Sequence, residues 1–141
     1  MTFLEFYNDA NYAFQPYEYK RDSKSIVSLD EEIFGDALDN ETLINSTGTV
    51  VYDKDKLIAY ILLEHHAAGT HIRSIGVNSA YQSSGIGSKL MKLVLNQQSR
   101  PITLNIDVNW HKEKLAAYYT KFGFKFSGKH APNGNEVWIL N

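Results

Sequence analysis

The chain has 141 residues, which is the length of one ordinary domain, so we expect a single domain over residues 1–141. Hydrophobic residues make up 43% of it and the formal net charge is −2, which argues against intrinsic disorder and indicates no nucleic-acid partner. The absence of cysteine excludes disulfides, thiolate zinc sites and a catalytic cysteine.

The sequence also carries no signal for export or for a membrane. Residues 1–6 lack the basic and apolar regions of a signal peptide. The longest apolar run, residues 57–63, is far too short to span a bilayer. We therefore expect a cytoplasmic protein without a membrane partner. We expect no metal site either, because His65 and His66 are adjacent on a predicted strand and face opposite sides.

Residues 1–20 are rich in aromatic side chains, which we interpret as an edge strand and its cover, with a homodimer surface as the alternative. Residues 17–20 alternate in character and predict the first strand. The aromatic residues are Phe3, Phe6, Tyr7, Tyr12, Phe14, Tyr17 and Tyr19.

A helix is predicted next, with Asp22 and Ser23 as possible caps and apolar residues at helical spacing as far as Phe34. Gly35 is expected to end it. A second, short helix is predicted over residues 39–44. We interpret the acidic residues of this region as a solvent-facing helix surface, with a wall that faces a substrate as the alternative; they are Glu31, Glu32, Asp36 and Asp39.

Three strands of an antiparallel meander are predicted over residues 49–52, 57–66 and 70–77. Residues 53–56 and 67–69 are expected to form the turns between them, because both segments are short and rich in turn-forming residues.

The second half of the chain alternates helices and strands. Residues 85–98 predict an amphipathic helix with Ile86, Leu90 and Val94 on one face. A meander followed by such alternation predicts a mixed α/β sheet. The remaining predicted elements are a strand over 102–108, a helix over 112–122 and strands over 124–129 and 136–140.

The most informative segment is residues 75–91, where an apolar strand, a polar turn with two glycines and an amphipathic helix follow one another. The first N–H groups of a helix have no intrahelical partner and carry partial positive charge. Glycines leave the backbone bare to a ligand, so a phosphate-bearing cofactor is predicted. Neither a Walker loop nor the dinucleotide fingerprint fits, because Lys89 follows Ser88 and Leu90 replaces the third glycine.

Two segments resemble motifs of the GNAT superfamily of N-acetyltransferases. Gln82, Gly85 and Gly87 match the (Gln/Arg)-x-x-Gly-x-(Gly/Ala) element, which in that superfamily binds the pyrophosphate of acetyl-CoA. Residues 115–124, with Tyr119 in the tyrosine place, are similar to its Leu-Tyr-x-Lys-Leu-Gly-Phe signature. The two motifs occur in the family's order, separated by one helix and one strand.

The resemblance implies a single acetyltransferase domain that uses acetyl-CoA as cosubstrate. The fold would be α/β (α+β): a mixed, mostly antiparallel central sheet of about six or seven strands, about four flanking helices, and a splayed parallel strand pair that holds the cofactor. The acetyl group would pass to a primary amine, small or peptidic, by direct attack in a ternary complex, since no nucleophile for a covalent intermediate is evident. The alternative is a non-catalytic acyl-CoA-binding or regulatory module on the same fold.

Through the resemblance, Tyr119 is the expected general acid for the leaving thiolate. Its spacing from Leu115 and Phe122 also fits the buried face of a helix, so packing is the alternative role. A backbone N–H near Val77 would be the donor to the carbonyl oxygen. The expected cofactor-binding residues are Ile75, Gly76, Val77, Gln82, Ser83, Ser84, Gly85, Ile86, Gly87, Ser88 and Asn109.

Two residues compete as the base that takes the proton of the amine, and a water relay is the third possibility. Asp107 precedes Tyr119 by twelve residues, as the acidic base does in bacterial family members that acetylate ribosomal proteins. His71 lies where histone-acetylating members carry glutamate, and histidine has a suitable intrinsic pKa. Lys112 departs from the family, which often has a cofactor-holding asparagine there; Asn109 is the candidate to replace it.

Overall fold

The computed structural model describes residues 12–141. The aromatic residues Phe3, Phe6 and Tyr7, which carry much of the predicted homodimer surface, lie outside the described residues. Within residues 12–141, no helix has both the length and the hydrophobicity needed to cross a membrane.

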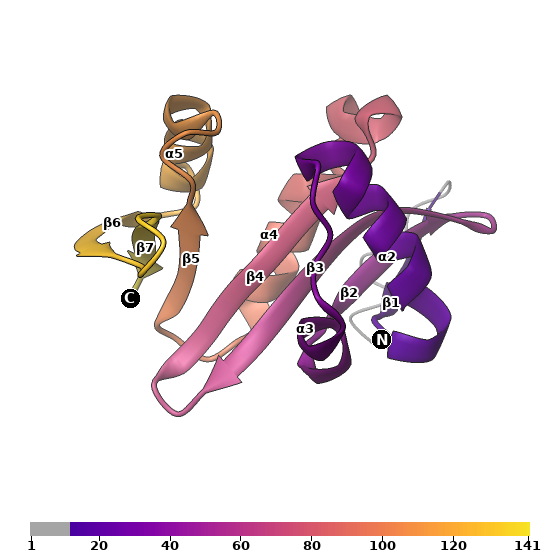
Figure 1. Cartoon of the computed structure of the whole chain (residues 1–141), viewed down its shortest axis with the longest axis horizontal. Coiled ribbons are helices and arrows are strands. Elements are labelled where there is room, and N and C mark those ends of the chain that lie inside the picture. Colours follow the sequence, from indigo (N-terminus) through magenta and orange to yellow (C-terminus); the bar gives the residue numbers. More distant parts are fainter. Residues whose placement is uncertain (1–11) are drawn as a thin grey trace.

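The described residues form one seven-stranded sheet, with strands β1 (Ala13–Pro16), β2 (Thr47–Asp53), β3 (Lys56–His66), β4 (Gly69–Val77), β5 (Ile102–Ile106), β6 (Lys125–His130) and β7 (Glu136–Leu140). Their order is β1-β2-β3-β4-β5-β7-β6 (Figure 1). All neighbours are antiparallel except β4 and β5, which are parallel. The predicted mixed, mostly antiparallel sheet is therefore confirmed.

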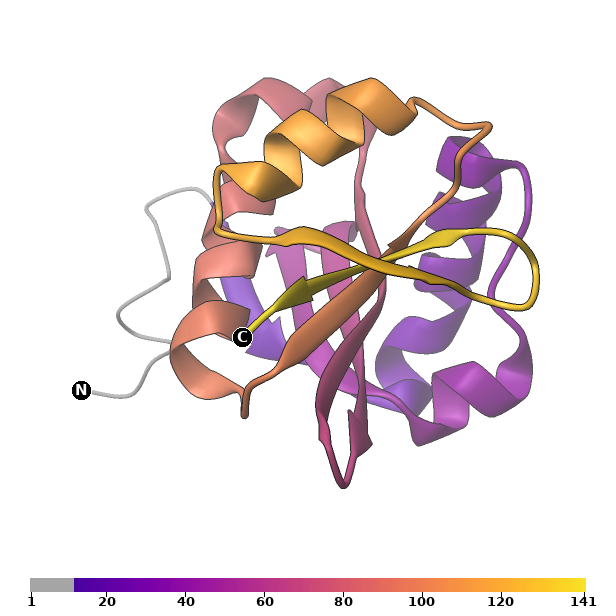
Figure 2. The same ribbon diagram turned by 90° about the vertical axis from the view of Figure 1, so that its left-hand side faces the viewer.

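Five helices lie among the described residues: α2 (Tyr19–Phe34), α3 (Asn40–Asn45), the 3-10 helix η1 (Ser79–Ser84), α4 (Ile86–Gln97) and α5 (Lys112–Thr120). They cover both faces of the sheet (Figure 2). On one face, α2 and α3 bury Ile26 and Leu43 against Tyr60 of β3. On the other, α4 and α5 bury the predicted apolar face of α4, including Leu90, in a larger core. The result is a three-layer domain with the sheet in the middle.

The strand predicted over residues 17–20 is wrong, because α2 already begins at Tyr19. The backbone N–H of Glu18, the N-cap, donates to the carboxylate of Asp22 at 2.9 Å. Asp22 therefore caps the helix from inside its first turns, not from in front of it as we expected. This local cap outweighs the alternating pattern, and Gly35 ends the helix as predicted.

Asp22 also joins α2 to the sheet. It is fully buried and accepts hydrogen bonds from Arg21 at 2.8 Å and from the hydroxyl of Tyr52 at 2.5 Å. Burial alone would raise its pKa, but the hydrogen bonds from Arg21, Tyr52 and the Glu18 amide hold the pKa of Asp22 below its usual value.

We expect Asp22→Asn to lower the free energy of unfolding by about 1–2 kcal/mol at pH 7, because an amide cannot accept from all of these donors. The folded pKa lies below the unfolded pKa of about 3.9, so this stability is present above pH 4 and fades as the pH falls through the folded pKa. Urea denaturation of wild type and variant at pH 7 and pH 3 measures the loss of unfolding free energy and its dependence on pH. A difference between wild type and variant that does not shrink in acid would contradict the ionic origin.

The parallel pair β4 and β5 is short and then separates (Figure 1). Residues 70–72 pair with residues 102–104, and no register continues beyond them. A β-bulge lies where the pairing stops, since Arg73 is an extra residue of β4 without a partner on β3. Bulges bend and twist a strand, so this one turns β4 away from β5. The splayed strand pair predicted through the family resemblance is thus present, and the bulge is its local cause.

Candidate active site

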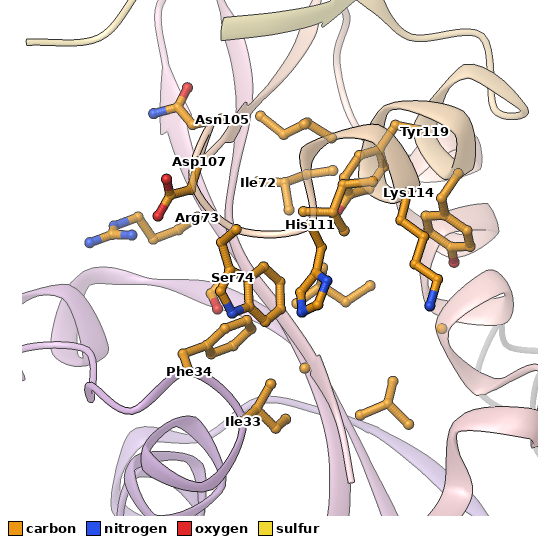
Figure 3. Close-up of a pocket in the computed structure, with 18 of the residues that line it drawn as sticks. Ile33, Phe34, Ile72, Arg73, Ser74, Asn105, Asp107, His111, Lys114 and Tyr119 are labelled. Atoms are coloured by element: carbon orange, nitrogen blue, oxygen red, sulfur yellow. The ribbon is translucent and has the colours of Figure 1, made fainter. Parts of the chain in front are cut away.

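The splay of β4 and β5 opens a cleft of about 1420 Å³ (Figure 3). Pockets for one small ligand usually measure about 300–1,000 Å³, so this cleft has room for two reactants. The second half of β4, the start of α4 and helix α5 form one side, which we call the α5 side. The end of α2, the residues that follow β5 and the β6–β7 turn form the other, which we call the α2 side.

Tyr119 lies in the wall of this cleft. It is only 7% exposed, and its ring packs against Tyr118 and Phe124. Burial, with a smaller contribution from Tyr118, raises the pKa of Tyr119 to about 12, so the phenol keeps its proton at neutral pH. Within residues 12–141 its hydroxyl has no hydrogen-bond partner, yet no fully buried polar side-chain atom there lacks one. The hydroxyl therefore opens into the cleft while the ring packs in the core.

Residues 82–88, which we call the glycine loop, form one end of the α5 side. Gly85 is the N-cap of α4 with a φ of +80°, a left-handed conformation that favours glycine. Gly87 and Ser88 lie in the first turn of α4, and both line the cleft. A Cβ built on Gly85 would meet no atom within 4 Å, whereas one on Gly87 would lie 3.3 Å from the Tyr118 hydroxyl. The N-terminal N–H groups of α4 are thus accessible from the cleft.

The end of β4 continues this surface. Gln82 donates from its side-chain amide to the carbonyl of Val77 at 3.4 Å and so ties η1 to the strand. The residues predicted to hold the cofactor that line the cleft are Ile75, Gly76, Val77, Gln82, Gly85, Gly87 and Ser88.

Four residues predicted to hold the cofactor do not line the cleft. Ile86 is 1% exposed and belongs to the core beneath α4. Ser83 and Ser84 are exposed on η1, where the Ser84 hydroxyl donates to the carbonyl of Tyr81 at 2.5 Å. Asn109 lines a separate, smaller depression at the start of α5. For Ser83 and Ser84 the reason is η1, a 3-10 helix where we predicted only a polar turn; both side chains are exposed on it.

The two candidate bases both line the cleft, in different settings. His71 pairs with Thr103 where β4 and β5 are still joined, and its Nδ1 is 2.7 Å from the Thr103 hydroxyl. Burial lowers the pKa of His71, so its ring is neutral at pH 7. Asp107 follows β5 in the open part of the cleft, is exposed, and accepts a hydrogen bond from the backbone N–H of Asn109 at 2.8 Å.

Lys112, where the family often has asparagine, makes a structural contact. Its ammonium pairs with Glu136 at 2.7 Å, and Glu136 also accepts from the indole of Trp138 at 3.1 Å. The ion pair attaches the first residue of α5 to β7, away from the cleft lining.

Aromatic side chains that were not predicted from the sequence line the α2 side of the cleft. Phe34, the last residue of α2, packs against Trp110 with 5.2 Å between ring centroids, and Trp110 packs against His111 at 4.8 Å. All three residues line the cleft, and Figure 3 labels Phe34 and His111. No spacing pattern links Phe34 to residues 110–111, so only the fold brings them together.

Charge is divided between the two sides of the cleft. Two lysines, Lys114 and Lys121, line the α5 side. Arg73 is the basic residue near the bulge. Glu32 and Asp36, which we interpreted as solvent-facing, are exposed but belong to the cleft lining. The carboxylates that line it are Glu32, Asp36, Glu64 and Asp107, and within residues 12–141 none of them forms an ion pair.

Known structures share this fold. Naa50 of Arabidopsis thaliana, in complex with the bisubstrate analogue CoA-Ac-MVNAL, is 21% identical, with a TM-score of 0.76 over 94% of this chain and 99% of that chain. An acyl-CoA N-acyltransferase of Pseudomonas aeruginosa is 16% identical, with a TM-score of 0.73 over 92% and 99%. The ribosomal-protein-S18-alanine N-acetyltransferase of Escherichia coli is 14% identical, with a TM-score of 0.72 over 91% and 90%. No curated protein sequence matches the chain.

The likeness to these structures is one of fold, because their identities are low. A family model described as an acetyltransferase (GNAT) domain, in contrast, matches residues 45–126, which is more than half of the chain. That range contains the glycine loop, both splayed strands and Tyr119. The chain therefore belongs to the GNAT family of acetyltransferases.

Proposed function

We propose that this protein is an N-acetyltransferase that moves an acetyl group from acetyl-CoA to a primary amine by direct attack in a ternary complex. One observation carries the proposal: the N-terminus of α4 and the unpartnered Tyr119 hydroxyl reach the same cleft between splayed strands. A helix N-terminus binds phosphate, and a protonated phenol can serve a leaving thiolate.

The residues of the α5 side fit acetyl-CoA. Gly85, Gly87 and Ser88 present bare backbone and N–H groups for a pyrophosphate, and Lys114 and Lys121 add positive charge for the phosphates. The related Naa50 structure, which holds a CoA-containing analogue, supports this assignment by its fold. Acetyl-CoA, when bound, supplies an activated thioester.

Tyr119 would act mainly by donating a hydrogen bond. Its pKa of about 12 lies roughly 3.5 units above that of a thiol, about 8.5, so complete transfer of its proton to a thiolate is uphill. A short hydrogen bond from the phenol still stabilises the negative charge that develops on sulfur. In the same way, a backbone N–H near Val77 would stabilise the charge on the carbonyl oxygen.

The α2 side would receive the acceptor. An ammonium group is attracted by the unpaired carboxylates there, and the face of Trp110 can contribute a cation–π interaction. The amine must lose a proton before attack, and either His71, neutral at pH 7, or Asp107 can take it. Small amines and peptide amines both fit this description.

The experiment is an assay of released CoA thiol with acetyl-CoA and a panel of amines: spermidine, L-lysine, glucosamine and a tripeptide with a free N-terminus. We expect turnover that saturates with at least one amine, at a rate well above that with acetyl-CoA alone. No turnover with any panel amine, together with thermal stabilisation by CoA, would instead support a non-catalytic acyl-CoA-binding module.

A further inference from the structure

A buried carboxylate lies behind the cleft and has no part in the proposed chemistry. Asp30 of α2 is 1% exposed. The hydroxyl of Tyr60, on β3, donates a hydrogen bond to Asp30 Oδ1, and the backbone N–H of Leu38 donates to Oδ2 at 3.2 Å. Burying a carboxylate is costly even when it is hydrogen-bonded, so its presence in the core needs an explanation.

The hydrogen-bonded chain continues from Asp30 to the cleft. The Tyr60 oxygen is also 2.9 Å from the hydroxyl of Ser74. Ser74 follows the bulge residue of β4 and lines the cleft, where Figure 3 labels it. A buried carboxylate on α2 is thereby connected, through two hydroxyls, to the surface between the splayed strands.

The direction of each hydrogen bond follows from the charge of Asp30. An ionised carboxylate only accepts, so Tyr60 must donate to it. The hydroxyl hydrogen of Tyr60 is then engaged in the bond to Asp30, so the Tyr60 oxygen can only accept from Ser74. The hydrogen of the Ser74 hydroxyl consequently points toward Tyr60, and its lone pairs are left for a donor in the cleft.

Packing holds the Tyr60 ring in place between Asp30 and Ser74. Its side chain is fully buried, and a Cβ built on Gly76 of β4 would lie 2.8 Å from its ring. The ring therefore packs directly beneath Gly76, in a space that exists because this residue has no side chain. The strand above holds the ring, and with it the Tyr60 oxygen, between Asp30 and Ser74, while the O–H bond can still turn toward either one.

We propose that Ser74 accepts an N–H of the acceptor amine, and that Asp30 and Tyr60 are positioning residues that keep its hydroxyl in the accepting orientation. This inference rests on the proposed function, and it adds an acceptor-binding residue outside the two motifs that resemble the family. An amine approaching the thioester carries N–H donors, which match an oxygen whose hydrogen is turned away.

The orientation should reverse when Asp30 takes up a proton. Burial raises the pKa of Asp30 to about 6, an increase that the Leu38 amide and the charge of Arg73 partly offset. Tyr60 and Ser74 face it as neutral hydroxyls. Protonated Asp30 can donate to Tyr60, which then donates to Ser74, and the Ser74 hydrogen is directed into the cleft against the N–H of the amine.

The test compares two tyrosines that make the same kind of contact. Tyr60→Phe and Tyr52→Phe each remove one hydrogen bond from a sheet tyrosine to a buried aspartate of α2, but Tyr52 and its partner Asp22 do not line the cleft. The assay uses acetyl-CoA and the best amine of the panel. We expect Tyr60→Phe to lower kcat/KM for the amine about tenfold, which corresponds to the free energy of one hydrogen bond. The KM for acetyl-CoA should be unchanged. Tyr52→Phe should retain wild-type kinetics.

Asp30→Asn provides a second variant that keeps the shape of the core. Its carboxamide oxygen can accept from Leu38 and its NH₂ group can donate to Tyr60, which fixes Ser74 in the donating orientation. We expect the same tenfold loss without a lower melting temperature. As the pH falls through 6, log kcat/KM of the wild type should drop by about one unit more than that of Asp30→Asn, because protonated Asp30 and asparagine leave Ser74 in the same donating orientation. All other groups are the same in both proteins, so the difference isolates Asp30.

These results separate the inference from the function on which it rests. An inactive wild type would overturn the proposed function. An active wild type in which Tyr60→Phe and Asp30→Asn match Tyr52→Phe, with no extra drop in log kcat/KM in acid, would overturn the inference alone and leave the network as a structural link between α2 and the sheet.

Discussion

Replacing Tyr119 with phenylalanine is expected to lower kcat about 100–1,000-fold, the size of effect usual for the loss of one hydrogen-bond donor to a developing negative charge. The KM for acetyl-CoA should change little, because the ring and its contacts with Tyr118 and Phe124 remain. The melting temperature should not fall, since the hydroxyl has no hydrogen-bond partner within residues 12–141 that its removal could leave unsatisfied. Steady-state rates of thiol release and a thermal melt measure all three quantities.

Tyr118→Phe is the matched control for this variant. Tyr118 is the sequence neighbour of Tyr119 on α5 and also lines the cleft, but its hydroxyl lies beside Gly87 in the glycine loop. We therefore expect its loss to affect the KM for acetyl-CoA more than kcat. If Tyr119→Phe retained the wild-type kcat, Tyr119 would be a packing residue, as its spacing from Leu115 and Phe122 also allows.

The architecture could be predicted from the sequence where a pattern recurs over many residues. The apolar face of α4 and the meander over β2, β3 and β4 each depend on several side chains, and the structure confirms them. The start of α2 could not be predicted from the sequence, because it depends on the single contact between Asp22 and the Glu18 amide. The bulge at Arg73 leaves no sequence signature, although it sets the splay that forms the cleft.

The buried acids of α2 do leave a pattern in the sequence. Asp22, Ile26 and Asp30 are spaced by four residues and share one helix face, and all three are buried. A carboxylate in the apolar stripe of a helix is a misfit that needs partners. Those partners, Tyr52 and Tyr60, lie on strands far along the chain, so the stripe indicates that buried acids exist but not what they bind.

The predicted role of the glycine loop in binding the CoA phosphates can be tested by introducing a negative charge there, which should stabilise α4 but repel the phosphates. Ser88→Asp places a carboxylate in the third position of α4, where the helix dipole stabilises it by about 0.3–1 kcal/mol. The same carboxylate would face the pyrophosphate of CoA, and repulsion between partly buried like charges a few ångströms apart costs roughly 1–4 kcal/mol. We expect CoA binding to weaken about 100-fold while the melting temperature of the free protein is unchanged or higher.

Asparagine has nearly the same shape as aspartate but no charge, so Ser88→Asn is the control. It should keep CoA affinity within about threefold of wild type. Isothermal titration with CoA at low and high salt provides the measurement, since screening should recover part of the affinity lost in Ser88→Asp. Wild-type affinity in both variants would mean that the phosphates bind elsewhere. A loss in both would indicate that the site has no room for a larger side chain. Only a loss confined to the charged variant, without a loss of stability, assigns the α4 N-terminus to the pyrophosphate.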